Sequence, residues 1–95
     1  MATFIVLCNF TDQGIKTIKE SPHRAEAFKA AAAKMGVTVK DICWTVGSYD
    51  LVVVCDGPEE AVTSALLKVG MAGNVRSETL RAYSAAEFGK ILAHV

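Results

Sequence analysis

The stretch Leu51-Val52-Val53-Val54-Cys55 is an uninterrupted apolar run. It follows the turn-like segment Gly47-Ser48-Tyr49-Asp50 and ends at Asp56-Gly57-Pro58. Because strand side chains point alternately to opposite faces, such a run predicts a strand that is buried on both sides. Phe4-Ile5-Val6-Leu7-Cys8 has the same character. A chain of 95 residues can cover one face of a small sheet with its own helices, so we expect the other face to pack against a second copy.

The remaining segments predict an alternation of strands and helices. Ser21-Pro22 predicts a helix start, with Ser as the cap and Pro in the first turn, and Gly36 ends this helix. Gly57-Pro58-Glu59-Glu60 predicts a second start. The predicted strands are residues 4–10, 37–46, 51–55 and 75–82, with a tight β-hairpin turn at Gly47 to Asp50.

Each predicted helix has an apolar side. The first two helices carry apolar residues at spacings of three and four, which suits packing against a sheet. The last helix begins at the capping box Ser84-Ala85-Ala86-Glu87, with Tyr83 and Phe88 at the positions of a hydrophobic staple. The apolar positions are Ala25, Phe28, Ala32 and Met35, then Val62, Ala65, Leu66 and Val69, and finally Phe88, Ile91, Leu92 and Val95.

This order predicts a single α+β domain over residues 1–95. It is the ferredoxin-like βαββαβ pattern, an antiparallel sheet with helices on one face, extended by a C-terminal helix. The first and third strands are central in this topology. Their apolar character on the uncovered face predicts a sheet-to-sheet dimer, the dimeric α+β barrel.

Composition narrows the functional classes. Ten basic and ten acidic residues give a net charge of zero without a basic cluster, which argues against nucleic-acid binding. No apolar run approaches the ~20 residues that span a bilayer, and no secretory signal begins the chain, so we expect no membrane association and a cytoplasmic protein. Cys8, Cys43 and Cys55 lack metal-site spacing and are interpreted as buried, reduced thiols, with a redox or metal role as the alternative.

The chain also resembles a known family. Four segments together are similar to the GYD domain family, and the similarity covers nearly the whole chain: Thr11-Asp12-Gln13-Gly14-Ile15-Lys16, Ser21-Pro22, Gly47-Ser48-Tyr49-Asp50-Leu51 and Gly73-Asn74-Val75-Arg76. The resemblance implies a dimeric ferredoxin-like α+β barrel, found mainly in bacteria, and it implies no catalytic residues.

A second, shorter resemblance concerns the hairpin. Gly47, Tyr49 and Asp50 are similar to the hairpin of the effector-binding module in the leucine-responsive regulator family, which lies near an interface that binds amino acids. The N-terminal helix-turn-helix domain of those regulators does not precede the module here. This departure speaks against a direct transcriptional role, and a free-standing ligand sensor is the role compatible with the resemblance.

Several residues are candidate ligand contacts. Tyr49 and Asp50 can hold a polar group at the hairpin, or pack at the interface and bond local backbone. Trp44 can line the same cleft or belong to the core. Arg76 and Arg81, on opposite faces of the fourth strand, can bind an anion or form ion pairs. Asn9 can reach the cleft or bond the turn after it.

We predict a small oligomeric binding module without cofactor or metal, holding a small polar or amphipathic metabolite near the Gly47 to Asp50 hairpin. One alternative is a cofactor-independent enzyme of the barrel superfamily. In that case His23, at a helix start that favours its neutral form, or Tyr49 handles a proton, and Arg76 or Arg81 holds the substrate. His23 is otherwise an exposed helix residue. A second alternative is a structural assembly subunit.

Overall fold

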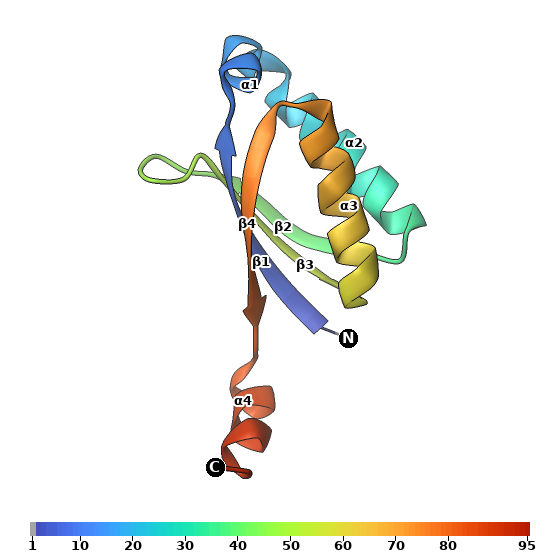
Figure 1. The fold of residues 1–95 in the computed structure, drawn as a ribbon, viewed down its shortest axis with the longest axis vertical. Coiled ribbons are helices and arrows are strands. Elements are labelled where there is room, and N and C mark those ends of the chain that lie inside the picture. Colours follow the sequence, from blue (N-terminus) through green and yellow to red (C-terminus); the bar gives the residue numbers. More distant parts are fainter. Residues whose placement is uncertain (1) are drawn as a thin grey trace.

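The computed structural model describes residues 2–95, which form a four-stranded sheet backed by two long helices (Figure 1). Short helical segments connect the first strand to the first long helix, and one more helix follows the last strand. The elements are β1 (Ala2–Phe10), α1 (Asp12–Lys16), the 3-10 turn η1 (Ile18–Glu20), α2 (Ser21–Lys34), β2 (Thr38–Trp44), β3 (Leu51–Gly57), α3 (Glu59–Ala72), β4 (Val75–Ala82) and α4 (Ala85–Leu92).

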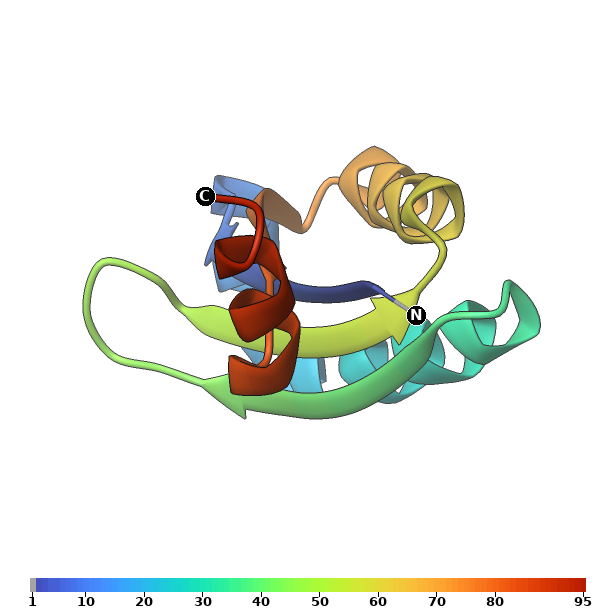
Figure 2. The ribbon, with the colours of Figure 1, turned by 90° about the horizontal axis from the view of Figure 1, so that it is seen from below.

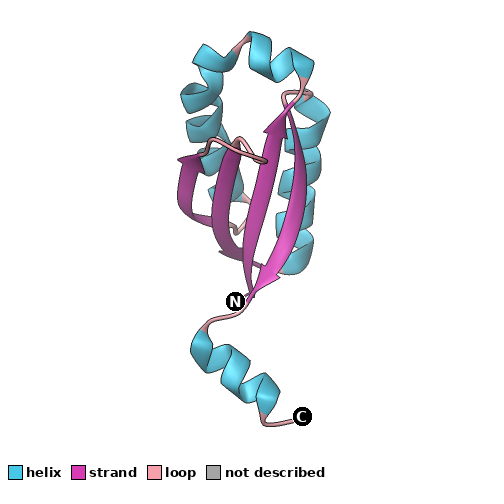
Figure 3. Cartoon of the chain, turned by 90° about the vertical axis from the view of Figure 1, so that its left-hand side faces the viewer, coloured by secondary structure: helices cyan, strands magenta, loops and turns pink. Residues whose placement is uncertain are grey.

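The sheet has the order β2-β3-β1-β4, and all neighbouring strands are antiparallel (Figure 3). The two apolar strands β1 and β3 are therefore the central pair. In the register, Phe4 lies opposite Cys55 on one side and Arg81 on the other. The predicted ferredoxin-like α+β fold with an extra C-terminal helix is confirmed.

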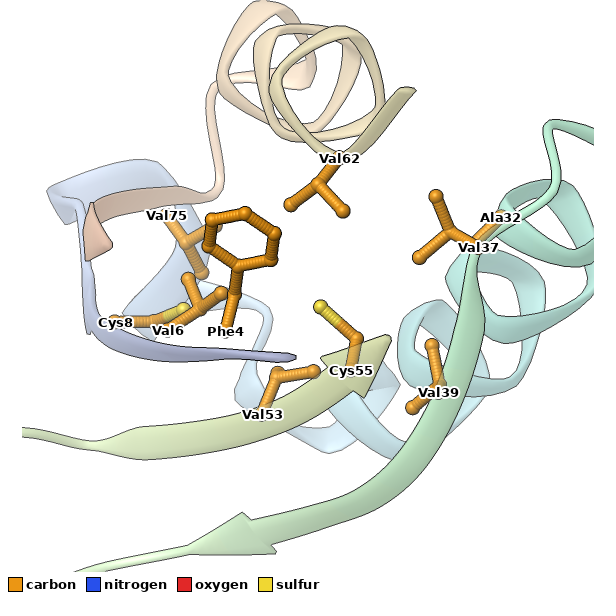
Figure 4. Close-up of a cluster of buried hydrophobic side chains, with 10 residues drawn as sticks. All are labelled: Phe4, Val6, Cys8, Ala32, Val37, Val39, Val53, Cys55, Val62 and Val75. Carbon is orange, nitrogen blue, oxygen red and sulfur yellow. The ribbon is translucent and has the colours of Figure 1, made fainter. Parts of the chain in front are cut away.

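The inner face of the sheet supplies the core. Phe4, Val6 and Cys8 of β1 alternate into the layer below the helices, together with Val53 and Cys55 of β3 (Figure 4). Val6 is fully buried. The sequences of β1 and β3 are continuous apolar runs because the side chains on the opposite face of the sheet are apolar as well.

The opposite side of the sheet is covered by no element within residues 2–95. We call it the open face; its central residues are Ile5, Leu7, Val52, Val54 and Leu80. Leu80 is 43% exposed, and the other four are partly exposed. The predicted partner sheet would cover this surface, and the sheet-to-sheet dimer stays a prediction.

Three details differ from the sequence-based expectations. The hairpin connection is a loop over residues 45–50, not a tight turn, and it projects away from α2 and α3 (Figures 1 and 2). β2 ends at Trp44 and contains a register shift between Val39 and Asp41. Ser21 is not the cap of α2: the position before the helix is Glu20, without a side-chain cap bond, and the Ser21 hydroxyl is buried instead.

α4 begins as predicted and packs on neither layer of its own chain. Ser84 and Glu87 form both bonds of the capping box, and the Tyr83 and Phe88 rings lie 6.5 Å apart between centroids. The helix continues past the end of β4 and stands away from both layers (Figures 1 and 3). Its apolar residues Phe88, Ile91, Leu92 and Val95, which we call the α4 stripe, are exposed.

None of the helices formed by residues 2–95 combines the length and the hydropathy that a membrane crossing requires.

Candidate functional site

A cavity of about 470 Å³ lies between the inner face of the sheet and the helices α2 and α3. β1 and β3 form its floor through Val6, Phe10 and Val53, and the two helices form its walls. Apolar side chains make up most of its lining. The helical contributions include Ala25, Phe28, Ala31, Ala32 and Met35 from α2 and Ala65, Leu66, Val69 and Ala72 from α3.

The cavity exists because the facing helix surfaces are rich in alanine. The apolar side of α2 carries Ala25 and Ala32 where larger residues would fill the interior, and α3 carries Ala65 and Ala72. Alanine side chains are too short to reach across the space between two helices that rest on a twisted sheet. The helices meet the sheet, and apolar space remains between them.

Most polar side chains at the cavity already have protein partners. The Ser21 hydroxyl accepts a hydrogen bond of 2.9 Å from Trp44 Nε1. The Arg24 guanidinium donates to the backbone carbonyls of Thr17 and Gly14 at 3.0 and 3.3 Å. Asn74 Oδ1 accepts from Gln13 Nε2 at 3.0 Å. These groups are consequently satisfied without a ligand.

Lys68 is different. It lines the cavity from α3, and its side chain is exposed, so it lies at the rim. The one ion pair found within residues 2–95 joins Lys40 to Asp56 at 3.7 Å, which leaves the Lys68 ammonium without a carboxylate partner. Together with Arg24, it gives the rim a positive character.

The thiol in the cavity is protonated at neutral pH. Burial raises the pKa of Cys8 to about 11, and burial followed by the nearby Asp56 carboxylate raises the pKa of Cys55. Both remain protonated thiols, which are poor nucleophiles. The expectation that all three cysteines are buried is wrong for Cys43, which is exposed on β2 beside Asp41.

The hairpin residues bind other parts of the chain. Asp50 accepts a hydrogen bond of 2.9 Å from the Phe10 backbone N–H, and its own N–H donates to the Cys8 carbonyl at 2.9 Å. Asp50 thus continues the β1–β3 pairing beyond the strand end. Tyr49 donates to Glu78 Oε2 at 2.8 Å, and this bond raises the pKa of the Tyr49 phenol. Neither residue lines the cavity.

The other predicted site residues are also outside the cavity lining. Trp44 is half-exposed, and its indole N–H reaches only Ser21. Asn9 and Arg76 are register partners. The Arg81 guanidinium stacks over the Phe4 and Tyr83 rings, 5.5 and 4.3 Å from their centroids.

His23, the predicted base of the enzymatic alternative, is exposed in the first turn of α2 and does not line the cavity. Among residues 2–95 there is no group of three or more His, Cys, Asp or Glu side chains placed to hold a metal ion.

Sequence reasoning missed the cavity residues Arg24, Lys68 and Asn74. The signal that points to them is the run of alanines at residues 30–33 on a helix that otherwise has the apolar spacing of a core element. Small residues on a core-facing stripe indicate either close helix contact or empty space. The sequence alone does not separate these two outcomes.

Comparison with known proteins identifies the family. The family model for the GYD domain matches residues 4–92. The chain belongs to the GYD domain family. The match reaches every strand and all four α-helices, so the resemblance predicted from the four sequence segments is confirmed.

Comparisons with curated proteins and with solved structures both find similarity to a GYD-type protein from Thermus thermophilus. The curated relative, named glutamine synthetase and cystathionine beta-lyase binding protein, is 35% identical over 89 residues, which cover 92% of this chain and 94% of the relative. A crystal structure from the same organism is 25% identical to this chain in the structural alignment. It superimposes with a TM-score of 0.55 over 90% of this chain and 96% of its own.

Proposed function

We propose that this GYD domain protein is a small binding module whose cavity holds an apolar molecule with one anionic end. The observation that carries the proposal is the cavity itself. Its volume of about 470 Å³ falls in the range of roughly 300–1,000 Å³ that is typical of small-molecule sites. The binding position therefore moves from the hairpin, where the sequence predicted it, to the space between sheet and helices.

The lining decides the chemistry of the ligand. The walls offer apolar contact, and Ser21, Arg24 and Asn74 spend their hydrogen bonds on other protein groups. Lys68 is the cation at the rim for which neither an ion pair nor a side-chain hydrogen bond is found among the described residues, whereas Arg24 is bound to Thr17 and Gly14. A ligand that buries a hydrocarbon or aromatic body and leaves a carboxylate at the rim matches both features.

The test uses decanoate as the probe and decanol as its neutral counterpart, with binding measured by isothermal titration calorimetry. We expect decanoate to bind and decanol to bind more weakly. Ala31→Trp places a large ring at the cavity wall and should abolish binding. Ala30→Trp is the matched control, because Ala30 is exposed on the same helix and does not line the cavity.

Lys68→Gln tests the anionic end separately. It should weaken decanoate binding by about threefold to tenfold, the usual value of one charge-assisted contact at a partly exposed site, and leave decanol binding unchanged. Equal binding of decanoate by the Ala31→Trp variant and the native protein would show that the ligand sits elsewhere. Failure of both probes at millimolar concentration would reject an amphipathic ligand.

A second candidate function is the binding of a metabolic enzyme. It is favoured by the printed name of the 35% identical relative, and by Leu67 and Met71, which are 64% and 85% exposed on α3. Large apolar side chains with such exposure are typical of contact surfaces for other proteins when they lie together.

This candidate is tested with purified glutamine synthetase and cystathionine beta-lyase from the organism that encodes the chain, by biolayer interferometry. Met71→Asp should weaken the association at least about tenfold if α3 is the contact. Ala30→Asp, an exposed position on α2 instead of α3, is the control. Absence of binding to either enzyme would remove this candidate and leave the cavity proposal standing.

A further inference from the structure

The mouth of the cavity lies between α2 and α3, which run beside each other on the same side of the sheet (Figure 1). Residues that line the cavity and are also exposed to solvent mark this mouth. They are Ala27 and Ala31 on α2, and Lys68 and Ala72 on α3. A group that extends through the mouth therefore enters solvent and not a second enclosed space.

The end of the cavity near residues 11–20 is closed by hydrogen bonds. Gln13 Nε2 donates to the Ala72 carbonyl at 3.0 Å, and the Thr11 hydroxyl donates to the Gly73 carbonyl. On the other side, Arg24 Nη1 donates to the Thr17 carbonyl at 3.0 Å. These bonds join residues 11–20 to both helices. A ligand consequently enters between α2 and α3, and its polar end lies at the mouth.

Two positive charges at the mouth are not neutralised within residues 2–95. Lys68 has no ion pair, and the Arg24 guanidinium binds only uncharged oxygens of Thr17 and Gly14. A carboxylate carries one negative charge, whereas a phosphate monoester carries about 1.5 to 2 at pH 7 and has three acceptor oxygens. A phosphate therefore matches the two cations better. The carboxylates of α2 and α3 do not line the cavity: Glu26, Glu59 and Glu60.

The size of the cavity limits what it can enclose. Its volume of about 470 Å³ lies in the lower half of the roughly 300–1,000 Å³ range of small-molecule sites, which suits one hydrocarbon chain and leaves a large head group outside. Leu67 and Met71, each next in sequence to a mouth residue, are 64% and 85% exposed. A head group that extends over α3 would cover these apolar side chains.

On the basis of the binding function proposed above, we propose that the cavity takes only the acyl chain of its ligand. The ligand's bulky, phosphate-bearing head group stays outside, beside Lys68 and Arg24. Two kinds of molecule share this chemistry, namely acyl thioesters of coenzyme A and single-chain phospholipids. Both join one hydrocarbon chain to a head group that carries phosphate.

The test compares decanoyl-coenzyme A and decanoyl-lysophosphatidate with decanoate by isothermal titration calorimetry. At least one of the two conjugates should bind about tenfold more tightly than decanoate, because its phosphate meets both cations. The conjugate that binds more tightly identifies the source of the ligand. Coenzyme A without an acyl chain is the control for the head group, and it should bind at least about 100-fold more weakly than decanoyl-coenzyme A, since it buries no chain.

A charge added at the mouth tests where the head group lies. Ala27→Glu should weaken binding of the tighter conjugate at least about tenfold by repulsion of the phosphate. Binding of the uncharged decanol should stay within about threefold, which also shows that the variant is folded with its cavity intact. Ala30→Glu is the matched control, because Ala30 is exposed on the same helix and does not line the cavity; it should have less than about a threefold effect on either ligand.

The outcomes separate this proposal from the binding function on which it rests. If decanoate binds and neither conjugate binds more tightly, the head group is not held at the mouth, and only the present proposal is overturned. Equal binding of coenzyme A with and without its chain, or equal effects of Ala27→Glu and Ala30→Glu, would also overturn it. Failure of decanoate, decanol and both conjugates to bind would overturn both proposals together.

Discussion

At the scale of single residues, Gly14 shows how closely two parts of this chain approach. It lies in α1, and a Cβ added to it would stand 1.9 Å from the backbone oxygen of Asn74. The same oxygen accepts a hydrogen bond of 3.0 Å from the Thr11 backbone N–H. The segment after β1 is thus fixed against the segment before β4, at one end of the cavity.

Gly14→Ala should lower the free energy of unfolding by at least about 2 kcal/mol, because backbone must move to admit the methyl group. Urea denaturation measures this loss of unfolding free energy. Gly70→Ala is the matched control: Gly70 lies in α3 with open space around its Cα, and alanine should raise stability there by up to about 1 kcal/mol. Equal stability of both variants would contradict the close approach.

The buried thiol of Cys8 predicts a pH dependence of stability. Its pKa is raised to about 11 in the folded chain from 9.0, so the unfolded chain loses its proton first. The resulting stabilisation is complete below pH 9 and is lost as the pH rises through 9 to 11. The stability difference between the native protein and Cys8→Ala, followed by urea denaturation, should shrink over that window. A constant difference would show that the thiol is accessible to water.

The individual roles of Asp50 and Trp44 illustrate what the sequence leaves open. Both were candidate ligand contacts, with a structural interpretation beside each. Their hydrogen-bond partners, the Phe10 N–H and the Ser21 hydroxyl, lie 40 and 23 positions away. Residue type indicates that such side chains will form hydrogen bonds, whereas the partner depends on the fold.

At the scale of elements, neighbouring residues of β3 lie in different environments because their side chains point alternately to the two faces of the sheet. Val53 is 5% exposed and faces the helices, while Val54 belongs to the open face. The sequence predicted the strand and its two apolar sides. It did not indicate which side the chain itself covers, because both sides carry the same residue types.

Val53→Asp should destabilise the folded chain by at least about 3 kcal/mol, because its carboxylate would lie unpaired in the core. Val54→Asp, one position away, should cost less than about 1 kcal/mol when measured in dilute solution, where only the single chain contributes. Thermal or urea unfolding of both variants provides the measurement. Similar losses from both would mean that the strand does not alternate as described.

The start of α4 is the most completely predicted helix start in this chain, because the capping box and the aromatic pair are both local sequence features. Ser84→Ala should make formation of α4 less favourable by about 1 kcal/mol. We expect this as a loss of helical signal in circular dichroism. Ser64→Ala, in the exposed middle of α3, should cause no loss. The hydrogen bond from the Ser84 backbone N–H lowers the pKa of Glu87. The stabilisation of the helix start by this bond is therefore present at neutral pH and is lost as the pH falls through the acidic range.

At the scale of the whole molecule, local patterns were enough to predict the order of elements and the antiparallel topology. The cavity and the position of α4 were not predicted. The cavity depends on how far two alanine-bearing helices are held apart by the sheet, and the position of α4 depends on the backbone angles of Ser84. Neither quantity is determined by the pattern of apolar residues within one element.

Occupation of the cavity should act on the molecule as a unit, because the sheet and both helices line it. At a decanoate concentration about 100-fold above its dissociation constant, the free energy of unfolding should rise by about 2.7 kcal/mol. Differential scanning calorimetry with and without decanoate measures the shift, and the Ala31→Trp variant should show none. A shift of equal size in that variant would indicate binding outside the cavity.

The register shift between Val39 and Asp41 has a further consequence for the way copies assemble. β2 is an outer strand, and an outer strand with regular spacing offers unpaired backbone groups to which a foreign strand can attach. The irregular spacing and Lys40 make the backbone groups of β2 less available for pairing with such a strand. Addition of a strand from another molecule is therefore disfavoured at the β2 edge of the sheet.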